Sequence, residues 1–401
     1  MRYPTRRIAP NVRMQIRPQN RSSLVSRRTA AILRRSNKRR RPKVNWSAVT
    51  SGITALTAVG ALIFTALSLN ATRDQVSVTQ QGQFTERYSR AVEQLGQQGP
   101  DQLQIRLGGI YALERLAHDS PRDQPTIVEV LATFVRATAA NMLDEFRQGF
   151  ACIPDAPKTP LPDIQAALTV LSRRDRTHDN NTIVDLSQTC LRGANLSGMN
   201  LSGADLAHAN LYGADLTGTN LNDANLGLAN FAQTTLTDVN LIGANLTGAN
   251  LTNAYLSDAH LNHANLSFTD FGNSYLGGAD LSEASFDSTN LAHADLTNAK
   301  LIRAHVNSSN FQYADLSYTD LNHAALSEAW FVSAKLRHAD LTNADLYGAN
   351  LAHADLFSAD LTGANLTNAD LYGTNLSGAE HNSSTLVTNS NADGTTSGKW
   401  W

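Results

Sequence analysis

The chain has very little cysteine. Its 401 residues include two, Cys152 and Cys190, and no CxxC pair. A thiolate zinc site needs more cysteines, and a disulfide framework places several bridges in one short chain. The sequence therefore excludes the first and gives no sign of the second. If this part of the chain is exported, a Cys152–Cys190 bridge could join its segments, but two unpaired thiols are the favoured interpretation.

Acidic residues are missing from the N-terminal region, since the first is Asp74. Residues 1–45 carry a net charge of +15. A segment with this charge and few apolar residues cannot fold alone, so we interpret residues 1–45 as a basic, disordered head.

Charge of either sign is missing from Val44 to Thr72. About 20 apolar residues suffice to cross a bilayer, so we predict a single transmembrane helix over residues 46–72, in contact with membrane lipid. A buried helix of a soluble protein is the less favoured alternative. A cleaved signal peptide is disfavoured because the basic region is long and no clear small-residue cleavage site follows. The basic flank predicts a cell-membrane protein whose N-terminus is cytoplasmic and whose remainder is extracytoplasmic.

Residues 75–175 have the apolar spacing of a small helical module. Helical patterns begin near Phe84, Leu107, Thr126 and Asp163, the third of them with a capping box. We expect this module to cover the open edge of whatever follows it.

Interruptions are absent from the next part of the chain. An apolar residue stands at every fifth position from Leu186 to Leu376, which makes 39 consecutive units, as in Ala194-Asn195-Leu196-Ser197-Gly198. A helix face repeats every 3.6 residues and a strand face every 2, so neither can gather these side chains. A solenoid can, if each unit forms one side of a coil and points its large residue inward.

At these residues the chain closely resembles the pentapeptide-repeat family, and its preceding helical segment is similar to that of membrane-anchored actinobacterial members. The resemblance implies that residues 181–380 form a right-handed quadrilateral parallel β-helix, with 20 residues per coil and about ten coils. The polar residues 381–401 are expected to be a disordered tail. Large centre-position side chains should fill the core, among them Leu196, Leu206, Leu216, Phe231, Leu246, Phe271, Phe311, Phe331, Leu346 and Leu366.

The outward positions have a structural explanation. Glycine two residues after the leucine permits positive φ at a corner, and Asn or Asp just before the leucine can bond nearby backbone. Six histidines take the same corner position and are interpreted as solvated residues rather than metal ligands: His208, His263, His293, His323, His338 and His353. Because no loop insertion forms a pocket, we predict no catalysis, no metal and no cofactor.

Acidic residues gather in two columns of the solenoid, which has a net charge of −15 over residues 181–380. The residues of this candidate interaction surface are Asp295, Asp315, Asp320, Asp340, Asp355 and Asp360. The resemblance implies one rival function, a DNA-mimicking inhibitor of a type II topoisomerase (gyrase). The favoured hypothesis is a membrane-tethered scaffold that presents a rigid solenoid to a protein partner, with nucleic acid an improbable ligand because the basic head lacks interleaved aromatics.

Overall fold

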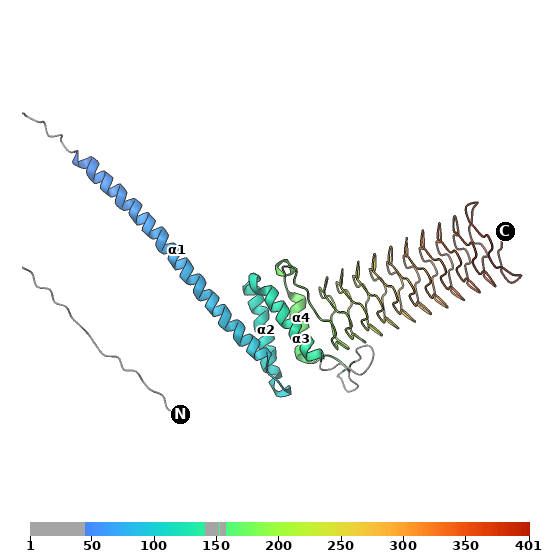
Figure 1. The fold of residues 1–401 in the computed structure, drawn as a ribbon, viewed down its shortest axis with the longest axis horizontal. Coiled ribbons are helices and arrows are strands. Elements are labelled where there is room, and N and C mark those ends of the chain that lie inside the picture. The colour runs from blue at the N-terminus through green and yellow to red at the C-terminus, as the bar shows by residue number, and fades with distance from the viewer. Residues whose placement is uncertain (1–44, 141–151, 153–157) are drawn as a thin grey trace, which may run out of the picture. The chain divides into compact units, whose positions relative to one another are not determined.

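The computed structural model describes residues 45–140, 152 and 158–401 (Figure 1). The basic head, apart from its last residue, lies outside the described residues. The chain divides into two compact units, Met1–Arg73 and Asp74–Trp401.

The first described element is α1 (Trp46–Leu95), a single helix of 50 residues. The sequence predicted a membrane helix ending at residue 72 and a separate helix near Phe84. The two are continuous because residues 73–83 contain no proline and only one glycine, so nothing in that stretch stops helical hydrogen bonding.

Within α1, the N-terminal half exposes large apolar side chains. Leu62 is 71% exposed and Phe64 is 73% exposed. Among the described residues, α1 contains one segment long and apolar enough to cross a membrane, a property that a signal sequence near an N-terminus would share.

The helical module packs shorter helices against the end of α1. Its elements are η1 (Pro100–Gln102), α2 (Leu103–Asp119), η2 (Pro121–Asp123), α3 (Gln124–Ala140), α4 (Pro162–Arg173) and η3 (Arg176–His178). Ala91 of α1 and Ile110 of α2 are buried, as are Leu131 of α3 and Leu168 of α4. At Gly109 a Cβ atom would lie 2.7 Å from the Ala91 carbonyl oxygen, so glycine allows α1 and α2 to approach closely.

Residues 184–380 form a parallel β-solenoid, visible in Figure 1 as a stack of similar coils. From Asp185↔Asp205 to Asp360↔Glu380, each bridge joins residues 20 apart. The predicted 20-residue coil is therefore confirmed. The structure places the ten core residues named from the sequence inside, each at most 1% exposed. Phe311 and Phe331 stack one coil apart, with ring centroids 4.9 Å apart.

The corners follow the expected chemistry. Gly198 has φ 64° and His208 has φ 60°, so both adopt the left-handed conformation. In many units the residue before the leucine is Asn or Asp, and its side chain bonds the backbone two residues on, as where Ser187 N donates to Asp185 Oδ1 at 3.0 Å.

The C-terminal segment corrects one expectation from the sequence. Residues 381–401 were expected to be disordered, but three of them pair with the coil before them: Asn365 with Leu386, Asp370 with Asn391, and Asn375 with Ser397. The spacing grows to 21 or 22 residues because the turns are longer than in the regular coils. The five-residue pattern fails in this segment, but backbone hydrogen bonding to the preceding coil does not require that pattern.

Candidate interaction surfaces

The first coil of the solenoid is covered by the helical module. Its four bridge positions are Asp185, Cys190, Asn195 and Asn200, one on each side. Each is engaged by a group that precedes the repeats. At Asn195 and Asn200 these contacts pair backbone groups that would otherwise be open to another chain.

On one side, the Gln165 side chain of α4 takes the place of a missing coil. Asn195 N donates to Gln165 Oε1 at 3.1 Å, and Gln165 Nε2 donates to the Asn195 carbonyl at 2.7 Å. One coil later, Asp215 makes the same two bonds with backbone atoms, donating to the Ala194 carbonyl and accepting from Leu196 N. The carboxamide thus mimics a peptide group at the edge.

Arginines cover two further sides. Arg174 Nη1 donates to the Asn200 carbonyl at 3.1 Å, while its Nε bonds Asp179 at 2.9 Å. Burial lowers the pKa of the Arg174 guanidinium, and Asp179 opposes that shift. Arg136 of α3 forms an ion pair with Asp185.

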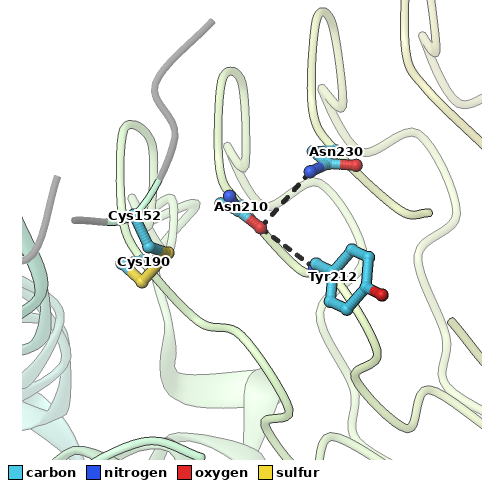
Figure 2. Close-up of a disulfide and its surroundings, with 5 residues drawn as sticks. All are labelled: Cys152, Cys190, Asn210, Tyr212 and Asn230. Carbon is cyan, nitrogen blue, oxygen red and sulfur yellow. Dashed lines mark hydrogen bonds between the residues drawn. A yellow bond between two sulfur atoms is a disulfide. The ribbon is translucent and has the colours of Figure 1, made fainter. Parts of the chain in front are cut away.

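The fourth side carries a disulfide between Cys152 and Cys190, with their Cα atoms 5.6 Å apart (Figure 2). The expectation of two unpaired thiols is therefore wrong. The 38-residue separation gave no sign of pairing, because only the fold brings Cys152 to the edge of the first coil. Figure 2 also shows the next residues of the same column, Asn210 and Asn230.

The aspartates of the two acidic columns stack as the sequence predicted, and each column also contains a lysine. Asp320, Asp340 and Asp360 are successive residues of one ladder, with Lys300 preceding them. Asp295, Asp315 and Asp355 share another with Lys335.

Two of these carboxylates are paired with bases. Lys335 Nζ lies 3.1 Å from Asp315 Oδ2, and Arg337 Nη1 lies 2.9 Å from Asp355 Oδ2. Partial burial raises the pKa of Asp315, but hydrogen bonds from Ser317 and Lys335 outweigh it, so the net pKa is lowered. The Asp315 carboxylate is thus ionised at neutral pH, and Lys335 partly neutralises it.

The sequence gave no sign of a hollow in the helical module. It has a volume of about 340 Å³ and lies between α2, α3 and α4, over an apolar floor that includes Ile127, Leu131 and Val170. Arg173 and Glu114 stand 3.5 Å apart at its rim. Helix periodicity cannot reveal this hollow, because the hollow is lined by residues from three different helices.

The histidines remain apart on the solenoid corners. His263, His293 and His353 all have positive φ. Residues 45–140, 152 and 158–401 contain no group of three or more His, Cys, Asp or Glu side chains that could hold a metal ion.

The comparisons with known proteins identify the repeats. Pentapeptide repeats match in eight copies within residues 184–262 and 264–380. Among curated proteins, none matches the chain.

Three solved structures are similar to part of the chain. HetL, a pentapeptide repeat protein involved in heterocyst differentiation regulation in the cyanobacterium Nostoc sp. strain PCC 7120, is 31% identical, over 51% of this chain and 88% of its own (TM-score 0.32). QnrB1, a plasmid-mediated fluoroquinolone resistance protein, is 16% identical over 45% and 91% (TM-score 0.34). A pentapeptide repeat protein of the Arabidopsis thaliana thylakoid lumen is 23% identical over 25% and 68% (TM-score 0.22).

The repeat matches agree with the 20-residue coils observed here. The chain belongs to the pentapeptide repeat family.

Proposed function

We propose that the protein is a non-catalytic, membrane-tethered scaffold whose solenoid is presented to a protein partner outside the cytoplasm. The observation that carries the proposal is the exposed apolar half of α1. None of the residues in its apolar window is buried, and a helix that leaves such side chains exposed is stable only if lipid or a partner covers them.

The disulfide supports an extracytoplasmic location for the solenoid. Bridges persist in oxidising compartments and are rare in the cytosol. The Cys152–Cys190 bridge therefore favours an extracytoplasmic solenoid, in agreement with the basic flank before α1.

The tether is tested by comparing Leu62→Arg with Val78→Arg. Both residues lie in α1 and each is 71% exposed, but Val78 is outside the predicted span of residues 46–72. An arginine at the centre of a span costs about 2.5–3.5 kcal/mol, so Leu62→Arg should reduce the share of protein that resists carbonate extraction. Equal extraction of both variants would contradict the tether.

The side of the membrane is tested with reporters fused to the C-terminus. We expect the alkaline phosphatase fusion to be active, because this enzyme requires export. We expect the green fluorescent protein fusion not to fluoresce, because that reporter folds in the cytoplasm. In intact cells, an impermeant maleimide should label Cys152 and Cys190 only after reduction. A fluorescent green fluorescent protein fusion, with cysteines that stay unlabelled in intact cells even after reduction, would reverse the assignment.

The partner surface is assigned to the ladder of Asp320, Asp340 and Asp360, where carboxylates repeat in successive coils. Photocrosslinkers on this ladder should trap a specific protein, and replacing the three residues with Lys should abolish the adduct. A crosslink pattern unchanged by this charge reversal would move the partner elsewhere.

The DNA-mimicking inhibitor of gyrase remains the rival, since a row of carboxylates on a narrow solenoid can stand in for phosphates. The tether and the bases in both acidic columns weigh against it. Addition of the full chain in detergent to a gyrase supercoiling assay tests the rival directly. Inhibition at micromolar protein, lost on charge reversal of the three aspartates, would favour it over the scaffold.

A further inference from the structure

One side of the solenoid differs from the other three in charge. We call it the amide face; it comprises the outward residues of the units centred on every twentieth residue from Leu191 to Leu371. Its charged residues are Arg192, Asp270 and Asp370, spread over nearly the whole length of the solenoid. The remaining acidic residues of the solenoid lie on the other three sides.

The bridge column of this face is a ladder of carboxamides. Asn290 Nδ2 donates to Asp270 Oδ1 at 2.8 Å, and Asn310 Nδ2 donates to Asn290 Oδ1 at 3.1 Å. Asn310 Oδ1 also accepts from Gln312 N, which fixes the orientation of its amide. Each of these Nδ2 bonds uses one of two N–H groups, and the side chains are half-buried, so the ladder presents ordered N–H donors to solvent.

Trp330 interrupts this ladder between Asn310 and Asn350. Its side chain is 54% exposed, although the next residue, Phe331, is fully buried. An indole in this column adds little to the core and cannot accept a hydrogen bond from Asn350, because its nitrogen is only a donor. Folding of the solenoid therefore does not explain this residue.

Tyr313 is a second exposed aromatic of the amide face. It is 55% exposed and has φ 61°, a conformation that disfavours bulky side chains. It stacks on His293 of the preceding coil, with ring centroids 4.9 Å apart. Tyr372, 44% exposed, lies further along the same side. Aromatic surface is thus held outward at intervals along the solenoid axis, at a conformational cost in Tyr313.

We propose that the amide face binds an uncharged polysaccharide laid along the solenoid axis. A nearly neutral face complements a neutral polymer, whereas a charged protein partner is better matched by the acidic sides. Aromatic rings present negative π-faces that attract the polarised C–H groups of sugar rings, and carboxamides exchange hydrogen bonds with hydroxyls. Coils about 4.8 Å apart repeat these contacts regularly, which suits a chain of repeating units. This inference goes beyond the scaffold function and does not depend on it.

The test is calorimetric titration of the full chain in a detergent without a sugar headgroup. The probes are cellohexaose, chitohexaose and laminarihexaose. We expect saturable binding of at least one of them, and an affinity that is the same at about 0.1 M and about 1 M NaCl, because screening does not affect uncharged contacts.

The decisive variant is Trp330→Asn, which continues the carboxamide ladder and should fold normally. It should weaken binding at least about tenfold, as should Tyr313→Ala, since exposed aromatics act as anchors at interfaces. Tyr255→Ala is the matched control, because Tyr255 also occupies a bridge position and is 48% exposed, but on a neighbouring side.

Three results would overturn the proposal. These are failure of all three hexasaccharides to bind the unmodified chain at about 10 mM, full binding by Trp330→Asn, and equal loss in Tyr255→Ala. The main alternative is that the amide face contacts a second copy of the chain, and sedimentation of the same samples tests it. If no probe binds and Trp330→Asn converts a dimer to a monomer, the face contacts a second copy of the chain and the polysaccharide assignment is wrong.

Discussion

The helical module and the solenoid build their cores in different ways. In the module, Ala91, Ile110, Leu131 and Leu168 come from four helices of different sequence and are buried in a core that has no repeat. In the solenoid, each leucine meets its counterpart 20 residues away, and the contact recurs in every coil. The module should therefore lose its structure as a whole, whereas damage to the solenoid should remain near its origin.

The largest effect is expected from Asp163→Asn in the module. Asp163 is 1% exposed on its side chain and lies 2.6 Å from Arg106 Nε. Removal of one charge from a buried pair costs about 3–5 kcal/mol, so hydrogen exchange should accelerate across α2, α3 and α4 together. The double variant Arg106→Met/Asp163→Leu should recover part of the stability. Acceleration confined to α4 would contradict the cooperative module.

A slightly smaller effect is expected from Leu296→Ala in the middle of the solenoid. Leu296 is fully buried, and its truncation should cost about 2–5 kcal/mol. Because coils contact only their neighbours, exchange should accelerate in the coils centred near residues 276, 296 and 316. The same acceleration near Leu206 or Leu366 would show that the solenoid unfolds as one unit and remove the contrast with the module.

The boundary between the two regions is tested by Gln165→Ala. This variant removes both bonds to Asn195, at a cost of about 1–3 kcal/mol for unsatisfied edge groups. We expect faster exchange at Asn195 and a greater tendency to aggregate through the open edge, measured by light scattering. Gln165→Glu keeps the acceptor and loses the donor, so its effect should lie between those of the unmodified chain and the alanine variant.

The smallest effect is expected from Lys335→Met on the surface of the solenoid. The lowered pKa of Asp315 means that its contribution to stability is present above its unfolded pKa, about 3.9, and is lost as pH falls through the folded value. Removal of Lys335 should bring the folded pKa closer to the unfolded one. Since Lys335 is 61% exposed, the stability lost near pH 7 should be below about 1 kcal/mol.

The control for Lys335→Met is the same measurement at a pH well below the folded pKa of Asp315, where the carboxyl is protonated in both states and the two proteins should unfold alike. A loss that persists at this pH would assign the effect to packing of the lysine stem rather than to its charge.

The sequence predicted the solenoid residue by residue, because its period is local. Any five-residue unit shows which side chain points inward, so Leu196 and Phe331 could be assigned to the core without knowledge of their neighbours in space. The helices of the module were also recognisable, except that α1 continues through residue 72 where no helix breaker stands. The turns after Glu380 were missed, since they keep the backbone pairing of the coils without the five-residue pattern.

Prediction of the surfaces depended on the tertiary structure more strongly than prediction of the solenoid core did. The acidic columns followed from the 20-residue coil alone, but the pairing of Lys335 with Asp315 needed side-chain geometry. The hollow between α2, α3 and α4 and the Gln165 cap had no signature in the sequence, because each depends on groups brought together from distant positions.

By itself, the sequence of this protein determined the coil, its core and the order of its segments, since hydrophobic periodicity acts over a few neighbouring residues. Only the tertiary structure decided that Cys152 meets Cys190 and that four groups from before the repeats close the first coil. Such contacts join residues tens of positions apart, and their partners are selected by the path of the chain in space rather than by any local pattern.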